Sequence, residues 1–405
     1  MPQSQMPSRR FLTIFCGLAL ALNAFSCDML LPAFFAIEAD LGGPIERVQA
    51  VIPIFLAAAG LGQIVFGPLS DRYGRRPVMA AGLVLYISGA TAALLSPDIS
   101  TLLVARAVQG LGSSCGIVVA RAILRDSTAG KDLAAVVAST MAIFALGPIV
   151  APLVGVLMMA LGGWRGAFAS MAFVGCVLLV TLLTWLGETN KNRDPRALEP
   201  RRLASAAVSV VKHPQSRHFL LVGALMSAII VSLVANSPRV FKSAFGIEGL
   251  TYAVLFAITA AGIIAGQMVN SHLIGRFGVL LATRSAAIVL TVVNVVLALL
   301  ALSGGIGVVS FTVMLLLFNA SFVVVLGNCM SMVLEPHRNI AGLASSLFGS
   351  LTQLSGSAMA LFLLPVLQGN LVRWSLAQAG ATLVGLALIL AYRPAPRPAE
   401  AVGER

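Results

Sequence analysis

Two long apolar runs joined by one short charged stretch most constrain how this chain folds. Val48–Phe66 and Val78–Leu95 contain no charged residue, and each is close to the ~20 residues that carry a helix across hydrocarbon. Between them lies Gly67-Pro68-Leu69-Ser70-Asp71-Arg72-Tyr73-Gly74-Arg75-Arg76, which contains four charges. We interpret this stretch as a loop between two membrane helices, and its three arginines favour the cytoplasmic side.

The composition excludes a water-soluble domain. Of 405 residues, 58% are hydrophobic and only 10% are charged, whereas soluble domains are usually about a quarter charged. The net charge of +12 does not indicate nucleic acid, because the arginines gather in loops without interleaved aromatic residues. The cysteines and histidines lack metal-ligand spacing, so we expect no metal and no cofactor.

The apolar runs predict an all-α integral membrane protein with about twelve transmembrane helices. The expected spans are Phe11–Ile37, Val48–Phe66, Val78–Leu95, Thr101–Leu124, Leu133–Leu161, Phe168–Leu186, Phe219–Val240, Leu250–Ile274, Leu280–Leu302, Val308–Leu334, Ala341–Leu367 and Leu376–Tyr392. A long polar stretch, Gly187–Arg217, divides them six and six. We therefore expect an N-terminal bundle (residues 1–187), a cytoplasmic loop (188–218) and a C-terminal bundle (219–405).

The loop charges predict the orientation. If the N-terminus is cytoplasmic, roughly 20 lysines and arginines lie on cytoplasmic segments. The outside ones would be Arg47, Arg165, Arg239, Lys242 and Arg373. Both termini are thus expected in the cytoplasm.

The two halves of the chain repeat one pattern. Gly62-Gln63, Arg72 and Gly74 reappear with the same spacing as Gly266-Gln267, Arg276 and Gly278. Parallel six-helix repeats are typical of one large transporter class, with the substrate site between the halves. The second copy has Gly275 in place of Asp71, so the halves differ chemically.

Asp28 and Arg106 are ionisable residues well inside apolar runs, where a charge usually faces a cavity or a partner. Pro32 should loosen the helix after Asp28, and Asn23 lies nearby on the same helix. Gln109 shares a helix face with Arg106. We expect Asn23, Asp28, Arg106 and Gln109 to line a substrate cavity. Alternatively, Asp28 satisfies backbone groups near the outer interface, and Arg106 is a structural arginine bound to carbonyl groups.

Two further groups suggest moving parts. Arg121, Arg125 and Asp126 end the fourth span, near the charged loop, and would form a cytoplasmic ion network or remain a solvated face. The expected latch is Gly67, Asp71, Arg72, Gly74, Arg75, Arg76 and Asp126. In the fifth span, Gly147, Pro148, Pro152 and Gly155 predict a kinked hinge with a small-residue face.

These motifs resemble the major facilitator superfamily, and most closely its twelve-helix drug:proton antiporters of the Bcr/CflA-like branch. Gly67–Arg76 resembles the loop 2–3 signature, and Arg106 with Gln109, Gly110 and Gly112 the helix-4 signature. Gly147-Pro148 with Ala151-Pro152 and Gly155 resembles the antiporter helix-5 signature, although Val156 stands where a second glycine is often found. The resemblance implies the major facilitator fold of two pseudo-symmetric six-helix bundles, and proton coupling through Asp28 and Arg106.

The expected function is proton-coupled efflux of small amphipathic drugs or toxic compounds by alternating access. The alternative is a proton-driven exporter of one metabolite, such as an amino acid or sugar. No H-E-x-x-H motif occurs, and we expect no enzyme. The expected partners are a small-molecule substrate, protons and the lipid bilayer. The expected protein is a monomer in a bacterial inner membrane.

Overall fold

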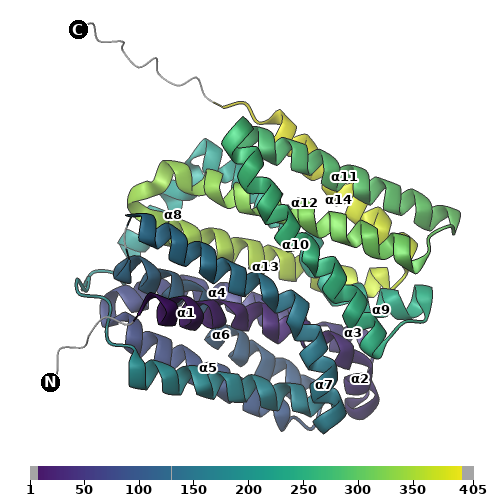
Figure 1. Ribbon diagram of the computed structural model, residues 1–405, viewed down its shortest axis with the longest axis horizontal. Helices are drawn as coiled ribbons and strands as arrows, with labels where there is room; N and C mark the ends of the chain where they lie inside the picture. Colours follow the sequence, from purple (N-terminus) through teal and green to yellow (C-terminus); the bar gives the residue numbers. More distant parts are fainter. Residues whose placement is uncertain (1–7, 129, 395–405) are drawn as a thin grey trace, which may run out of the picture.

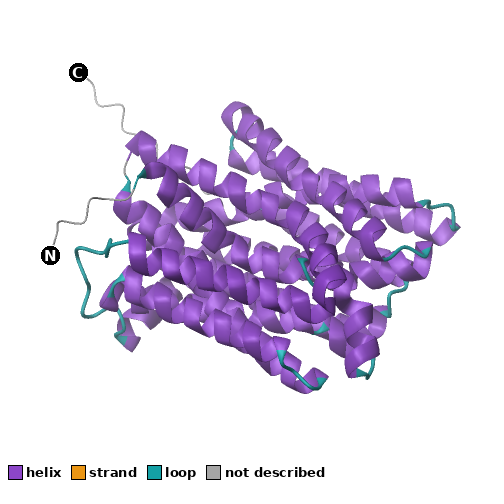
Figure 2. Cartoon of the chain, turned by 60° about the horizontal axis from the view of Figure 1, so that its bottom comes forward, coloured by secondary structure: helices purple, strands orange, loops and turns teal. Residues whose placement is uncertain are grey.

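The computed structural model describes residues 8–128 and 130–394, except the side chains of residues 131 and 134. Its first helices are α1 (Arg9–Asp28), η1 (Leu31–Ala33), α2 (Phe34–Leu41), α3 (Ile45–Gln49), α4 (Val51–Tyr73), α5 (Arg75–Leu94), α6 (Ile99–Ser127) and α7 (Gly130–Trp185). After these come α8 (Pro200–Lys212), α9 (Pro214–Phe245), α10 (Gly249–Phe277), α11 (Val279–Ser303), α12 (Val308–Leu334), η2 (Glu335–Ile340), α13 (Ala341–Leu367) and α14 (Leu371–Ala391). The described residues form no strand (Figure 2).

Ten helical stretches in the described residues are long and apolar enough to cross a membrane. Two are of double length, Ala135–Trp185 and Val308–Leu367. The first is interrupted at Gly163, whose φ of 61° no straight helix contains. The second is interrupted by η2. When the two arms of each are counted separately, the described residues contain the twelve spans expected from the sequence, and the chain is an all-α membrane protein.

The helices before and after α8 are here called the first half and the second half. In Figure 1 the purple and blue helices of the first half lie mainly below the green and yellow helices of the second half. The helix pairs α4 with α13, and α7 with α10, pack together across the boundary. The start of α1, the end of α14 and α8 lie at one end of the molecule (Figure 1), called the linker end below.

The sequence repeat has the same backbone geometry in both halves. Gly74 ends α4 with a φ of 107°, and Gly278 ends α10 with a φ of 79°. Glycine adopts such angles without a steric penalty, so the next helix begins at the following residue in each copy. The two copies therefore make the same tight turn, and only their side chains differ.

The segment between the halves is not entirely a loop, which corrects one expectation. Residues Pro200–Lys212 form the helix α8. Its apolar residues recur at helical spacing, and Val210 is fully buried. The sequence carried this signal, since Leu203, Ala206, Ala207 and Val210 follow an i, i+3, i+4, i+7 pattern. The helical pattern was not recognised because the segment also contains seven basic residues.

Candidate functional site

Asp28 lies where the first span is interrupted. The helix α1 ends at Asp28, and Pro32 sits inside the 3₁₀ turn η1 before α2 begins. This confirms the predicted break, which arises because proline has no N–H to continue the helix. Asp28 is only 6% exposed. The adjoining turn η1 packs against α7 and against α9 and α10 of the second half, so Asp28 lies near the boundary between the halves.

Arg106 is fully buried within the first half. Its guanidinium donates hydrogen bonds to the carbonyl oxygens of Val51 (3.1 Å) and Ser26 (3.2 Å) and to Oε1 of Gln109 (2.7 Å). It also lies 4.1 Å from the ring centroid of Phe55. Arg106 thus ties α6 to the backbones of α1 and α4, and its contact with Ser26 holds the helix end that carries Asp28.

The four residues expected to line a substrate cavity do not form one cluster of contacts. Arg106 and Gln109 are hydrogen-bonded to each other, whereas Asn23 donates to Oγ of Ser113 at 3.3 Å. No ion pair joins Asp28 to Arg106 among the described residues. Gln109, like Arg106, is fully buried. The hydrogen bond from Arg106 to the carbonyl oxygen of Ser26 therefore reaches the backbone of α1 two residues before Asp28.

Glycines let three helices approach α6 closely. A Cβ atom at Gly110, Gly112 or Gly116 would lie 2.2 Å from a backbone atom of α4, α5 or α1, respectively. No real Cβ atom tolerates that separation. The small-residue pattern around Arg106 is therefore a packing requirement, as the sequence predicted.

An ion network joins three helices at the linker end. Arg75 donates to Asp126 at 2.8 Å, to Asp71 at 2.5 Å and to Oγ of Ser70 at 2.8 Å. These residues lie on α4, α5 and α6, all in the first half. Arg76 instead donates to the carbonyl oxygen of Leu183 at 2.6 Å. The network fastens helices within one half and does not cross to the other.

The segment after α7 extends this network, although the sequence did not predict its contribution. The carboxylate of Glu188 accepts hydrogen bonds from the backbone N–H groups of Arg75 (2.8 Å) and Arg76 (3.2 Å). It thereby caps the N-terminus of α5. Asn190 donates to the carbonyl oxygen of Asp71 at 3.1 Å. The only sequence signal was an acidic residue directly after the sixth span.

Asp194 also fastens the segment between the halves to α4. Its N–H donates to the carbonyl oxygen of Asp71 at 3.0 Å. The N–H of Arg196, together with the guanidinium of Arg202, holds the pKa of the Asp194 carboxyl below its usual range. Asp194 therefore stays ionised near neutral pH and remains paired with Arg202, which belongs to α8.

We expect Glu188→Ala to loosen this attachment. Loss of a helix cap typically costs about 0.5–2 kcal/mol, so the segment between the halves should detach more often. Limited trypsin digestion of the purified protein should then cleave after Lys191 and Arg193 several times faster than in the wild type. Glu199→Ala is the matched control, since that side chain is half exposed and makes only a 3.7 Å surface ion pair. Equal cleavage rates in the wild type and Glu188→Ala would contradict the capping role.

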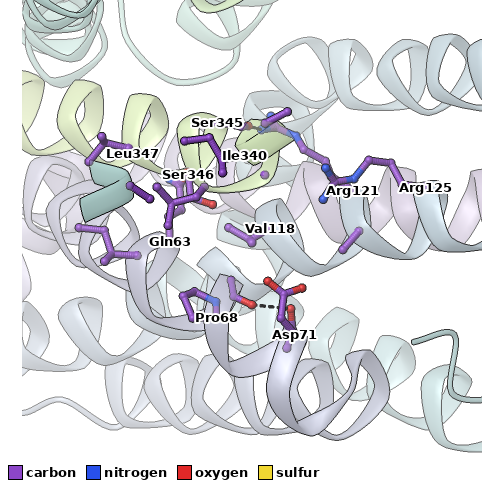
Figure 3. Close-up of a pocket in the computed structure, with 18 of the residues that line it drawn as sticks. Gln63, Pro68, Asp71, Val118, Arg121, Arg125, Ile340, Ser345, Ser346 and Leu347 are labelled. Atoms are coloured by element: carbon purple, nitrogen blue, oxygen red, sulfur yellow. Dashed lines mark hydrogen bonds between the residues drawn. The ribbon is translucent and has the colours of Figure 1, made fainter. Parts of the chain in front are cut away.

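A cavity of about 770 Å³ opens at the linker end between the two halves. Figure 3 shows lining residues from α4, α6, η2 and α13. Residues of α8, such as Leu203 and Ala206, also line the cavity. Of the residues assigned to the latch, Gly67, Asp71 and Arg75 line it. None of Asn23, Asp28, Arg106 and Gln109 does. The cavity and the buried Asp28 are therefore separate features along the boundary.

The halves also contact each other directly, both at the cavity wall, which Gln63 lines, and at the far end of the boundary. Nε2 of Gln63 donates to Oε1 of Gln353 at 2.8 Å. At the end opposite α8, Arg239 donates to Glu46 at 2.6 Å, and Gln49 donates to the carbonyl oxygen of Ala235 at 3.0 Å. The two halves are thus in contact at the end opposite α8, and they enclose the cavity at the linker end.

The residues assigned to the helix-5 hinge lie in α7, and they do not pack alike. A Cβ atom at Gly155 would lie 2.2 Å from the carbonyl oxygen of Met29, whereas at Gly147 it would meet only Ala24, at 3.8 Å. Both prolines, Pro148 and Pro152, lie inside the helix. Gly155 therefore allows α7 to touch the backbone next to Asp28.

This arrangement of two helical halves around a shared boundary defines a polytopic membrane transporter. The profile of the Major Facilitator Superfamily matches residues 16–360. The chain belongs to this superfamily, as its motifs predicted, and it is a transporter rather than an enzyme.

Its relatives agree with this assignment. The uncharacterized MFS-type transporter YdgK of Bacillus subtilis is 29% identical over 361 residues, covering 86% of this chain and 87% of that protein. The multidrug resistance protein MdtL of Escherichia coli is 29% identical over 388 residues, covering 94% and 95%, respectively. A partially occluded, inward-open structure of the xylose transporter XylE from E. coli superimposes with a TM-score of 0.72 at 15% identity, covering 95% of this chain and 98% of that one. The likeness to XylE concerns the fold alone.

Proposed function

We propose that this transporter exports small amphipathic compounds in exchange for protons. The observation that carries the proposal is the burial of Asp28 at the break in the first span, beside the boundary between the halves. A carboxyl group in such a place can be neutralised by one proton and can be exposed to either side as the halves move. The relationship to a protein named for multidrug resistance supports the substrate range.

We place the linker end in the cytoplasm, with both termini there, in the inner membrane of a bacterium. This orientation rests on the excess of lysine and arginine in the loops at that end. The working unit is a monomer of two six-helix bundles, residues 1–187 and 219–405. In this orientation the cavity opens to the cytoplasm, while the bridge between Glu46 and Arg239 closes the outer side.

Alternating access then requires the outer bridges to break as the cavity closes. The ion network around Arg75 keeps α4, α5 and α6 together during this motion. Arg106 keeps the end of α1 in place. Inward protons supply about 2.3 kcal/mol per charge per 100 mV, in addition to any pH gradient.

Drug-resistance profiling of bacteria that express the chain tests this function. We expect raised resistance to several unrelated amphipathic compounds, and lower accumulation of those compounds in the cells. An uncoupler that collapses the proton gradient should abolish the difference in accumulation. Efflux of one metabolite with no drug resistance would favour the single-substrate exporter instead. Resistance that survives the uncoupler would contradict proton coupling.

A further inference from the structure

The cavity at the linker end combines an apolar lining with an excess of positive charge. Its charged lining residues are Asp71, Arg75, Arg121, Arg125, Asp194 and Arg202. The two acids are already paired, Asp71 with Arg75 and Asp194 with Arg202. Arg121 and Arg125 therefore carry positive charges that no acidic residue of the cavity lining balances.

Among the residues that the structure describes, these two arginines pair with no carboxylate. No salt bridge joins Arg121 or Arg125 to an acid within residues 8–128 and 130–394. Arg121 donates a long hydrogen bond from Nη1 to Oγ of Ser345, at 3.4 Å. Figure 3 shows Arg121 and Arg125 together on one side of the cavity, with Asp71 apart from them.

Both arginines face the second half of the molecule. Ser345 belongs to α13, and the Nη2 atom of Arg125 lies 3.3 Å from where a Cβ atom of Gly342 would be. An anion bound here would therefore contact both halves at once. The arginines are one helical turn apart on α6, so their like charges oppose each other until an anion compensates them.

A protein carboxylate cannot easily take this place. The described part of the second half contains two acids, Glu248 and Glu335. Glu248 pairs with Lys242. Glu335 accepts a hydrogen bond from Gln215 at 2.9 Å.

We propose that Arg121 and Arg125 bind the anionic group of an amphipathic organic anion whose apolar body occupies the cavity. The guanidinium group suits carboxylates, sulfonates and phosphates because it presents paired N–H donors in one plane. This inference rests on the proposed export function and narrows its substrate class to compounds with a negative charge. An anionic lipid headgroup would offer the same chemistry, and the test distinguishes the two sources.

The test compares three probes that share one apolar body. They are 1-naphthaleneacetate, 1-naphthalenemethanol and the ammonium form of 1-naphthalenemethylamine. Binding to the full chain in nanodiscs of zwitterionic lipid is measured by equilibrium dialysis. We expect saturable binding of the carboxylate, at least about tenfold tighter than that of the alcohol or the ammonium ion. Equal or tighter binding of the ammonium probe would overturn the proposal.

Three variants locate the site, and a fourth serves as the control. Arg121→Gln and Arg125→Gln should each weaken binding of the carboxylate by about tenfold or more, with little effect on the alcohol. Arg121→Lys, which keeps the charge but loses the planar fork, should fall in between. Arg217→Gln removes an exposed arginine that does not line the cavity, and it should bind like the wild type. Unchanged affinity in both glutamine variants would overturn the assignment.

The lipid arm repeats the titration in nanodiscs that contain anionic phosphatidylglycerol. If soluble anions are the ligands, the affinity for naphthaleneacetate stays within about twofold. If the site holds a lipid headgroup, the affinity falls in the anionic discs, and Arg121→Gln abolishes that fall. This experiment measures binding and does not depend on transport. If the ammonium probe binds selectively to a chain that confers resistance, only this inference is contradicted. If the anion binds but the chain exports nothing, only the proposed function is contradicted.

Discussion

Asp28→Asn should abolish proton-driven accumulation while leaving the protein folded. Asparagine has nearly the same shape as aspartic acid, but it cannot bind and release a proton. In proteoliposomes with an imposed pH gradient, we expect substrate accumulation to fall at least about tenfold. Exchange of labelled for unlabelled substrate without a gradient should persist, because it requires no net proton movement.

Asp98→Asn provides the matched control for this change. Asp98 lies outside the spans and caps α6, where its carboxylate accepts from the N–H of Thr101 at 2.9 Å. Hydrogen bonds from Thr101 hold the pKa of Asp98 below its usual range. Asparagine also caps helices well, so this variant should transport normally. If Asp28→Asn still released a proton on adding substrate, the coupling residue would lie elsewhere.

Gly155→Val should remove transport by forcing α7 away from α1. The added Cβ atom would lie 2.2 Å from the carbonyl oxygen of Met29, a backbone atom that cannot rotate aside. Overpacking of this kind costs about 1–3 kcal/mol, and here the displaced backbone adjoins Asp28. We expect a lower midpoint of thermal unfolding in detergent and a loss of drug resistance.

Gly147→Val tests whether bulk in the same helix is enough to produce this effect. The Cβ atom at Gly147 would approach Ala24 no closer than 3.8 Å, which is ordinary contact. Its unfolding midpoint and transport should stay near those of the wild type. Comparable losses in both variants would mean that the whole small-residue face of α7 is needed, and that the contact with Met29 is not special.

Much of the fold was predictable from the sequence because the bilayer imposes a simple rule. Each apolar run of about twenty residues must be a helix, and the repeat around Gly74 and Gly278 then relates the halves. The break at Pro32 followed from its missing N–H. The helix α8 was missed because its short apolar stripe lies among many basic residues, although the helical spacing was present.

The site was predicted less completely, for a physical reason. The sequence indicates which residues are costly in a membrane, but it does not indicate what compensates them. Arg106 is satisfied by carbonyl oxygens of α1 and α4, which no side-chain pattern encodes. The cap by Glu188 and the proximity of Arg121 to Ser345 join residues more than one hundred positions apart, so only the folded chain brings them into view.

The most direct test of the central claim is proton movement driven by substrate in purified wild-type protein. The compound against which expressing cells are most resistant is added outside proteoliposomes that contain a trapped pH-sensitive dye and have no pH gradient. Antiport predicts that substrate entering the vesicle drives protons out, so the interior becomes alkaline, and that Asp28→Asn gives no such change. Substrate entry without alkalinisation in the wild type would contradict the account.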